Sequence, residues 1–188
     1  MPGYIGALTM IGLIGLVVTR VLMLKRAGIQ AMKFGETDKS DFFILPFALL
    51  YFYLVFAAAF NLPSLSTQEF FPYEAVAWGG VCLCLAGLAV LFLSLTAFGT
   101  SFRVGIDTQQ PDRLVTDGIF AYSRNPIYVA FGLVLLGQFL IFSNWILLIY
   151  LSAAVQLFHR QVLREESYLK QHYGDEYKAY CQRVRRYF

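Results

Sequence analysis

Residues 128–157 read YVAFGLVLLGQFLIFSNWILLIYLSAAVQL, a long and mainly apolar run with a polar break at Ser143-Asn144. A transmembrane helix needs about 20 mostly apolar residues, and one helix over this whole run would overshoot a bilayer. Two shorter or tilted helices joined by a tight turn at the break fit a membrane better. The run therefore predicts a helical hairpin whose two spans cover residues 128–142 and 145–157.

Three further apolar stretches come before this run, at residues 4–24, 42–60 and 75–95. Hydrophobic residues make up 58% of the chain and charged residues only 14%, whereas a soluble domain carries about 25% charged residues. We therefore predict an all-α integral membrane protein with about five transmembrane helices, folded as a single membrane domain over residues 1–188. The sizeable polar pieces, residues 96–127 and 158–188, flank the hairpin, so a site for a polar ligand must be built mainly from them.

The positions of the basic residues give an independent check on this topology. Cytoplasmic loops are enriched in Lys and Arg, and five spans place the two termini on opposite sides of the membrane. All 15 Lys and Arg residues then fall on one side, while the segments around residues 61–74 and 143–144 on the other side carry none. We therefore predict a multi-pass protein with its N-terminus outside and its C-terminus in the cytosol.

Several classes of function receive no support from the sequence. The net charge is only +3, so we expect no nucleic acid partner. Cys82 and Cys84 lie in an apolar run without a nearby His, Asp or Glu, which makes a poor metal site. The chain carries no P-loop, H-E-x-x-H or Ser–His–Asp arrangement, so metal catalysis and classical hydrolysis are unsupported.

The first polar piece contains a possible anion site. Pro126 suits the first turn of a helix, and Arg124 lies just before that helix start. A helix N-terminus with an adjacent Arg attracts carboxylate or phosphate groups. The alternative is that Arg124 only anchors the topology by extending its guanidinium to the interface.

The second polar piece is predicted to continue the last span as a helix, with a break and a new helix start at Gly174-Asp175. It carries Glu165 and Glu166, which point about 100° apart on a helix, so that only one can face straight into a site. Carboxylates suit ribose hydroxyls or a positively charged ligand. The alternative is a solvated, salt-bridged helix surface. His159, where the helix leaves the membrane, can serve either as a base or as an interfacial hydrogen-bonding residue.

The order of the motifs in these two pieces carries a family resemblance. The motifs are LVTDGIF at residues 114–120, SRNPIY at residues 123–128, the REE triplet at residues 164–166, and YGDEY at residues 173–177 before a basic tail. In this order, around a membrane hairpin, they resemble the isoprenylcysteine carboxyl methyltransferase family, whose relatives include membrane phospholipid methyltransferases. The resemblance covers residues from about Phe98 to the end, and the earlier spans match only in being hydrophobic.

The resemblance implies a methyltransferase that binds S-adenosylmethionine on the cytosolic side. Arg124, Glu165 and Glu166 are the catalytic candidates. The residues implied to line the cofactor pocket are Leu114, Val115, Gly118, Tyr122, Arg124, Asn125, Pro126, Tyr128, Glu165 and Glu166. Asn125 departs from the family pattern, because better-known eukaryotic members have His there. An amide cannot titrate, so a general base at that position is ruled out.

The implied reaction is an in-line methyl transfer, in which positioning supplies much of the rate. A carboxylate acceptor needs no base, so a carboxylate or thiol acceptor is favoured and an amine is possible. We expect a lipophilic small molecule or lipid that enters from the bilayer. Two alternatives remain at this point: an NADPH-dependent membrane reductase of the sterol-reductase type, which shares a similar R-x-P-x-Y region, and a non-catalytic membrane scaffold.

Overall fold

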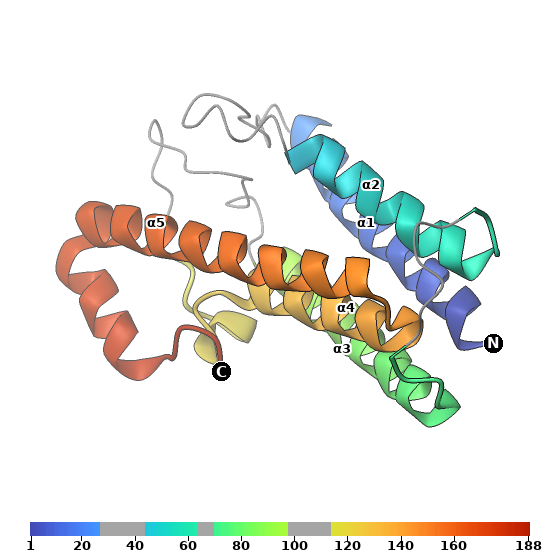
Figure 1. The fold of residues 1–188 in the computed structure, drawn as a ribbon. Helices are drawn as coiled ribbons and strands as arrows, with labels where there is room; N and C mark the ends of the chain where they lie inside the picture. The colour runs from blue at the N-terminus through green and yellow to red at the C-terminus, as the bar shows by residue number, and fades with distance from the viewer. Residues whose placement is uncertain (27–43, 64–69, 98–113) are drawn as a thin grey trace.

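The computed structural model describes residues 1–26, 44–63, 70–97 and 114–188. Its elements, in chain order, are α1 (Pro2–Arg26), α2 (Ile44–Ala59), α3 (Glu74–Ala97), the short 3-10 helix η3 (Gly118–Ala121), α4 (Pro126–Phe142) and α5 (Trp145–Arg183). The prediction of an all-α protein is confirmed for this part of the chain (Figure 1). Four of the basic residues behind the predicted orientation lie outside the described residues, namely Lys33, Lys39, Arg103 and Arg113.

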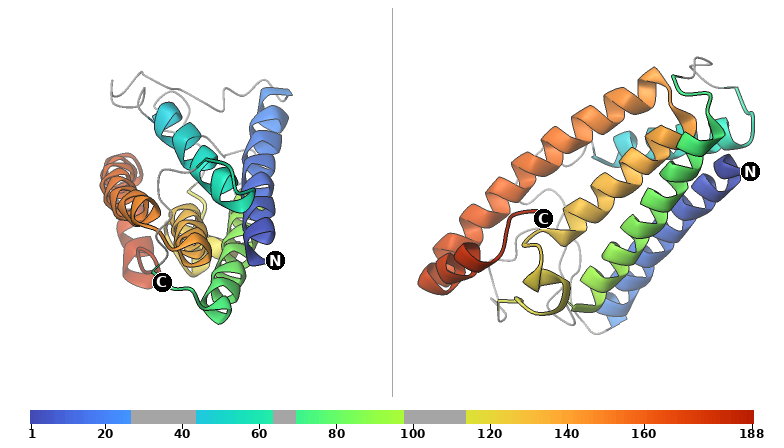
Figure 2. Two further views of the ribbon diagram at one scale, coloured as in Figure 1. Left: turned by 45° about the vertical axis from the view of Figure 1, so that its right-hand side comes forward. Right: turned by 90° about the horizontal axis from the view of Figure 1, so that it is seen from below.

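Within the described residues, three of the five α-helices are long and apolar enough to cross a membrane. The candidate spans are Pro2–Met23, Glu74–Ala97 and Trp145–Arg183, while the apolar parts of α2 and α4 are shorter, at Pro46–Ala59 and Pro126–Phe142. In Figure 2, α5, α4, α3 and α1 lie side by side in that order, and α2 packs against α1. An integral membrane protein with several apolar helices is therefore supported, and the count of five spans stays a prediction.

The hairpin turns where the sequence breaks. Helix α4 begins at Pro126 and ends at Phe142, and the backbone leaves the helical region at Ser143. Asn144 then caps α5, because its side-chain oxygen accepts a hydrogen bond from the Leu147 N–H at 3.0 Å. Such a cap satisfies one of the amides that a helix start leaves without a partner.

Helix α5 continues far beyond the predicted span. It is 39 residues long, which at about 1.5 Å per residue is well over the roughly 30 Å of a bilayer core. Only the first turns of α5 are apolar, and its polar continuation carries Glu165 and Glu166. At Gly174 the backbone takes φ 53° and ψ −118°, a conformation that glycine tolerates. The helix kinks there, and its last turns fold back toward η3 (Figure 1).

Helices α3 and α4 approach so closely that their backbones touch. A Cβ atom placed on Gly80 would lie 2.5 Å from the Gly137 carbonyl oxygen, and one on Gly137 would lie 2.5 Å from the Gly80 oxygen. Helices in membranes commonly associate through such small residues, because lipid provides no hydrophobic drive for packing. This contact fixes α4, and with it the start of the hairpin, against α3.

The close approach gives a prediction with a matched control. We expect Gly80→Ala to lower the free energy of unfolding by about 1–3 kcal/mol, because the new methyl group forces both backbones apart. Gly79 has no atom within 4 Å of its Cβ position, so Gly79→Ala should be neutral or stabilising by up to about 1 kcal/mol through helix propensity. Thermal unfolding of the two variants in the same detergent measures the difference, and equal midpoints would contradict the close packing.

A buried polar contact joins α1 to α4. The Gln138 amide nitrogen donates to the Gly6 carbonyl at 2.8 Å and to the Thr9 hydroxyl at 3.0 Å. Gln138 and Thr9 are both buried, and hydrogen bonds between helices are a recognised source of specificity inside membranes. Together with the α3–α4 contact, this bond holds α4 in place from two sides.

Candidate functional site

The hairpin brings the two polar pieces of the sequence together. Arg124 lies just before α4, and Glu166 lies on the polar continuation of α5. Their side chains form an ion pair in which Arg124 Nη2 lies 3.0 Å from Glu166 Oε1, and only 10% and 11% of the two side chains are exposed. Two predicted site residues that are far apart in the sequence are therefore in direct contact.

Arg124 uses most of its hydrogen-bonding capacity within the protein. Its Nε and Nη2 donate to Glu166 Oε1 at 3.2 and 3.0 Å. Its Nη1 donates to the carbonyls of Cys181 and Val184 at 3.1 and 2.9 Å. Those carbonyls lie at the end of α5, where the last C=O groups of a helix lack partners within the helix. The guanidinium therefore joins the start of α4 to the end of α5.

Glu166 accepts hydrogen bonds on both of its carboxylate oxygens. In addition to Arg124, the Asn125 amide donates to Oε1 at 3.2 Å, and Arg186 donates to Oε2 through Nε at 3.0 Å and Nη2 at 2.9 Å. Burial by itself would raise the pKa of Glu166, but the hydrogen bonds and charges of Arg186 and Arg124 outweigh it and lower the pKa. Glu166 is therefore an ionised anchor, with both oxygens used inside the protein.

Glu165 has a different environment. The Tyr128 hydroxyl donates to Glu165 Oε1 at 2.6 Å, and the Gln161 amide donates to the same oxygen at 3.1 Å. Among the described residues its second oxygen, Oε2, accepts no hydrogen bond. Burial raises the pKa of Glu165, and the hydrogen bonds from Tyr128 and Gln161 offset only part of this effect. A partly buried carboxylate with one free oxygen can still accept hydrogen bonds from a ligand.

Three of the remaining predicted site residues are buried or half-buried. Leu114 is buried and packs against Tyr177 and Tyr180 of α5, so the first polar piece also meets the C-terminal turns. Pro126 is buried at the first position of α4, and Val115 is half-buried.

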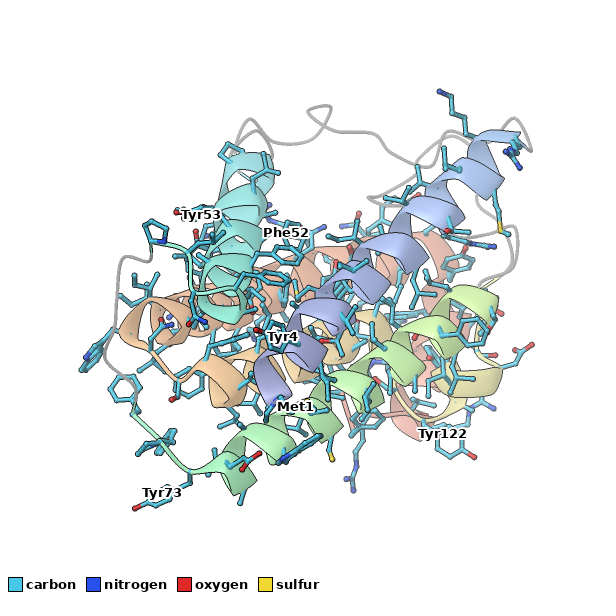
Figure 3. The ribbon with its side chains drawn as sticks, turned by 90° about the vertical axis from the view of Figure 1, so that its right-hand side faces the viewer. Met1, Tyr4, Phe52, Tyr53, Tyr73 and Tyr122 are labelled. Atoms are coloured by element: carbon cyan, nitrogen blue, oxygen red, sulfur yellow. The ribbon has the colours of Figure 1, made fainter. Side chains whose placement is uncertain are left out.

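Two residues lie apart from the acids. Gly118 is exposed and opens η3 with a positive φ of 60°. The side chain of Tyr122 is 72% exposed and points away from the helices (Figure 3). Neither residue is among the hydrogen-bond partners that the described residues give to the side chains of Arg124, Glu165 and Glu166.

Sequence analysis missed two side chains that touch the acids. Gln161 lies one turn before Glu165 on α5, and this i, i+4 spacing is a signal that could have pointed to it. Arg186 was assigned only to the basic tail, and nothing in its local sequence distinguishes it from its neighbour Arg185. Its pairing depends on the kink at Gly174, which turns the end of the chain back toward α4.

The comparisons with known proteins fall on the same region. A family model described as phospholipid methyltransferase matches residues 75–176, a stretch that covers nearly all of α3, the whole of α4 and α5 as far as the kink, with Glu165 and Glu166. The chain belongs to this phospholipid methyltransferase family. The resemblance derived from the motifs is thereby confirmed, and methyltransferases of this family use S-adenosylmethionine.

Two curated relatives show the extent of the similarity. The protein-S-isoprenylcysteine O-methyltransferase of Schizosaccharomyces pombe is 32% identical over 115 residues, which are 60% of this chain and 48% of that protein. Protein-S-isoprenylcysteine O-methyltransferase B of Arabidopsis thaliana is 30% identical over 108 residues, which are 56% of this chain and 55% of that protein. The chain thus matches only about half the length of these relatives.

Proposed function

We propose that this protein is a membrane methyltransferase that transfers a methyl group from S-adenosylmethionine to a lipophilic acceptor. The observation that carries the proposal is the meeting of the SRNPIY segment at residues 123–128 with the acidic pair. Tyr128 is bonded to Glu165, and Arg124 and Asn125 are bonded to Glu166. All of these residues lie within residues 75–176, the part of the chain that matches the family.

The residues present suit S-adenosylmethionine. The cofactor carries ribose hydroxyls and an amino group that a carboxylate binds well, and Glu165 offers an oxygen without a partner among the described residues. Tyr128 and Gln161 fix the other oxygen of Glu165 and so orient the free one. The backbone of residues 114–118 would contact the adenosine end. When bound, the cofactor supplies an activated methyl group on its sulfonium.

In this proposal the two acids have different roles. Glu166, neutralised by two arginines, holds the start of α4 against the end of α5. Glu165 faces the cofactor, while Arg124 acts by fixing the geometry of the site. Asn125 donates its amide to Glu166 and cannot take up a proton. The chain therefore contributes orientation and charge, which suits a displacement whose rate depends on alignment.

The acceptor follows from the placement of the site. The site begins where α4 and α5 leave their apolar segments, so a lipophilic acceptor can bring its reactive group to it from the bilayer. The relatives are named for methylation of isoprenylcysteine, an acceptor with a lipid tail and a carboxylate. A carboxylate or thiol at the end of an apolar chain is therefore the acceptor class that we propose.

The proposal is tested by transfer of a labelled methyl group. Purified protein in lipid vesicles is incubated with tritiated S-adenosylmethionine and either a prenylated cysteine analogue or the same analogue with its carboxylate amidated. We expect label in the first product and none in the second. Failure of the protein to bind S-adenosylmethionine in equilibrium dialysis would overturn the proposed function itself.

We further propose five spans, with the N-terminus outside and the C-terminus in the cytosol. The arginines that surround the site, Arg124 and Arg186, belong to the basic set that the positive-inside rule places in the cytosol. A reporter enzyme active only in the cytosol, fused after Phe188, should be active. The same reporter fused before Met1 should be inactive, and the reverse pattern would contradict this topology.

A further inference from the structure

We infer that the C-terminal tail, residues 184–188, forms one wall of the site and that Arg186 is a positioning residue for Glu166. This inference rests on the proposed function, because the site that the tail completes is the proposed cofactor site. By its sequence alone, the tail is only a basic segment expected on the cytosolic side. In the structure it is joined to the start of α4 and to α5 by both backbone and side-chain contacts.

The backbone of the tail is bound by the segment that precedes α4. After α5 ends, Val184 is extended, with φ −122° and ψ 134°. The Arg124 guanidinium donates to the Val184 carbonyl at 2.9 Å, and the Arg124 backbone N–H donates to the Arg185 carbonyl at 3.0 Å. The Asn125 amide donates to the Arg186 carbonyl at 3.1 Å. Three successive carbonyls are therefore bound, which fixes the register of the tail.

The two consecutive arginines of the tail, Arg185 and Arg186, have different environments. The Arg186 side chain binds Glu166 Oε2 through two nitrogens, at 3.0 and 2.9 Å. Arg185 is exposed, and its carbonyl accepts the hydrogen bond from the Arg124 N–H, the contact that the described part of the chain gives it. The two residues carry the same charge and lie next to each other, so a difference between them reports the contact with Glu166 and not the net charge.

Tyr187 attaches the tail to a second position on α5. Its hydroxyl lies 2.8 Å from the His159 Nδ1 atom. His159 and Glu166 are about two turns apart on α5 and so lie on the same face of that helix. Arg186 and Tyr187 therefore bind two points along one face, and the tail runs back along α5 toward the membrane. This contact gives His159 the role of an interfacial hydrogen-bonding residue.

The consequence concerns the acid that we assign to the cofactor. Glu165 and Glu166 are neighbours on the same helix, and Tyr128 and Asn125 both lie at the start of α4. Arg186 holds the Glu166 oxygen that Arg124 and Asn125 leave free. The tail thus fixes the spacing between α4 and α5 at the level where Tyr128 meets Glu165. Loss of the Arg186 contact should relax that spacing and weaken cofactor binding.

The experiment compares Arg186→Gln with Arg185→Gln in the full-length protein. We expect Arg186→Gln to raise the Kd and KM for S-adenosylmethionine about fivefold while kcat changes little, because the lost ion pair is partly exposed and acts on the cofactor only through Glu166. Arg185→Gln should stay within about twofold of the wild type, because exposed positions contribute little. Arg186→Lys keeps one charged donor and should recover part of the affinity.

A second measurement reports docking without reference to activity. The Arg124 amide should exchange slowly with deuterium in the wild type and faster in Arg186→Gln, because its acceptor is the Arg185 carbonyl. Equal cofactor affinity of the two Gln variants, in a protein that binds S-adenosylmethionine, would overturn the role of the tail and leave the proposed function standing. A wild-type protein that protects this amide and binds no cofactor would instead overturn the proposed function and the positioning role with it.

Discussion

Arg124→Ala should lower the free energy of unfolding by about 3 kcal/mol and reduce methyl transfer to near background. Removal of one partner of a buried ion pair typically costs about 3–5 kcal/mol, because the other charge is left buried. Glu166 keeps Arg186 and Asn125 as partners, so we expect the lower end of that range. The carbonyls of Cys181 and Val184 also lose their donor.

Thermal unfolding in detergent, measured beside S-adenosylmethionine binding, checks this prediction. At about 2–4 °C per kcal/mol for a chain of this size, the unfolding midpoint should fall by roughly 6–12 °C. Arg183→Ala is the matched control, since Arg183 is an exposed arginine at the end of α5, and we expect it to change stability by less than about 0.5 kcal/mol. A variant at Arg124 with an unchanged midpoint would return this residue to the role of a surface anchor.

Glu165→Gln and Glu166→Gln should fail in different ways. Glu165→Gln keeps one oxygen that can accept from Tyr128 and Gln161, and it replaces the second carboxylate oxygen and its charge with an NH2 donor. We expect an unchanged or slightly higher unfolding midpoint, because a neutral amide is easier to bury than a carboxylate. Cofactor affinity should fall roughly tenfold or more, since the lost contact is charge-assisted. Glu166→Gln places an amide NH2 against one of two arginines, so we expect its main effect to be a lower free energy of unfolding.

The two variants are compared by equilibrium dialysis with S-adenosylmethionine and by thermal unfolding of the same samples. We expect Glu165→Gln to bind S-adenosylmethionine more weakly while its unfolding midpoint stays normal. We expect Glu166→Gln to have a lower unfolding midpoint. Asp175→Asn serves as the control, because Asp175 is an exposed acid beyond the kink and pairs with the exposed Lys178. If Glu165→Gln binds the cofactor as the wild type does, Glu165 does not face it.

The helical plan was predictable because it depends on local composition. Apolar runs of sufficient length predict helices in a membrane, and the polar break at Ser143-Asn144, in a run too long for one span, predicts a turn between two of them. Pro126 marked the start of α4 for the same kind of reason. The polar continuation of α5 and its break at Gly174 were also predicted, whereas the direction in which the kink turns the last helical turns was not, because it depends on contacts with segments distant in the sequence.

The close approach of α3 and α4 depends on information that sequence patterns carry poorly. Both helices contain several glycines, and only some of them face the partner helix. Gly80 meets the backbone of α4, whereas its neighbour Gly79 has open space beside it. The rotation of each helix about its axis decides this difference, and rotation is set by packing against all neighbours at once.

For the site, the sequence was enough to predict which residue types lie near each other: an Arg-Asn-Pro-x-Tyr segment before one helix of a hairpin and two acids on the other. It could not assign the acids, because adjacent helical side chains diverge and either one could face inward. The folded chain shows that Glu166 pairs with Arg124 and Arg186 and that Glu165 accepts a hydrogen bond from Tyr128. The kink at Gly174 returns the tail to α4 and places a second arginine on Glu166. This pairing depends on segments that are distant in the sequence and adjacent in the fold, so no local sequence pattern specifies it.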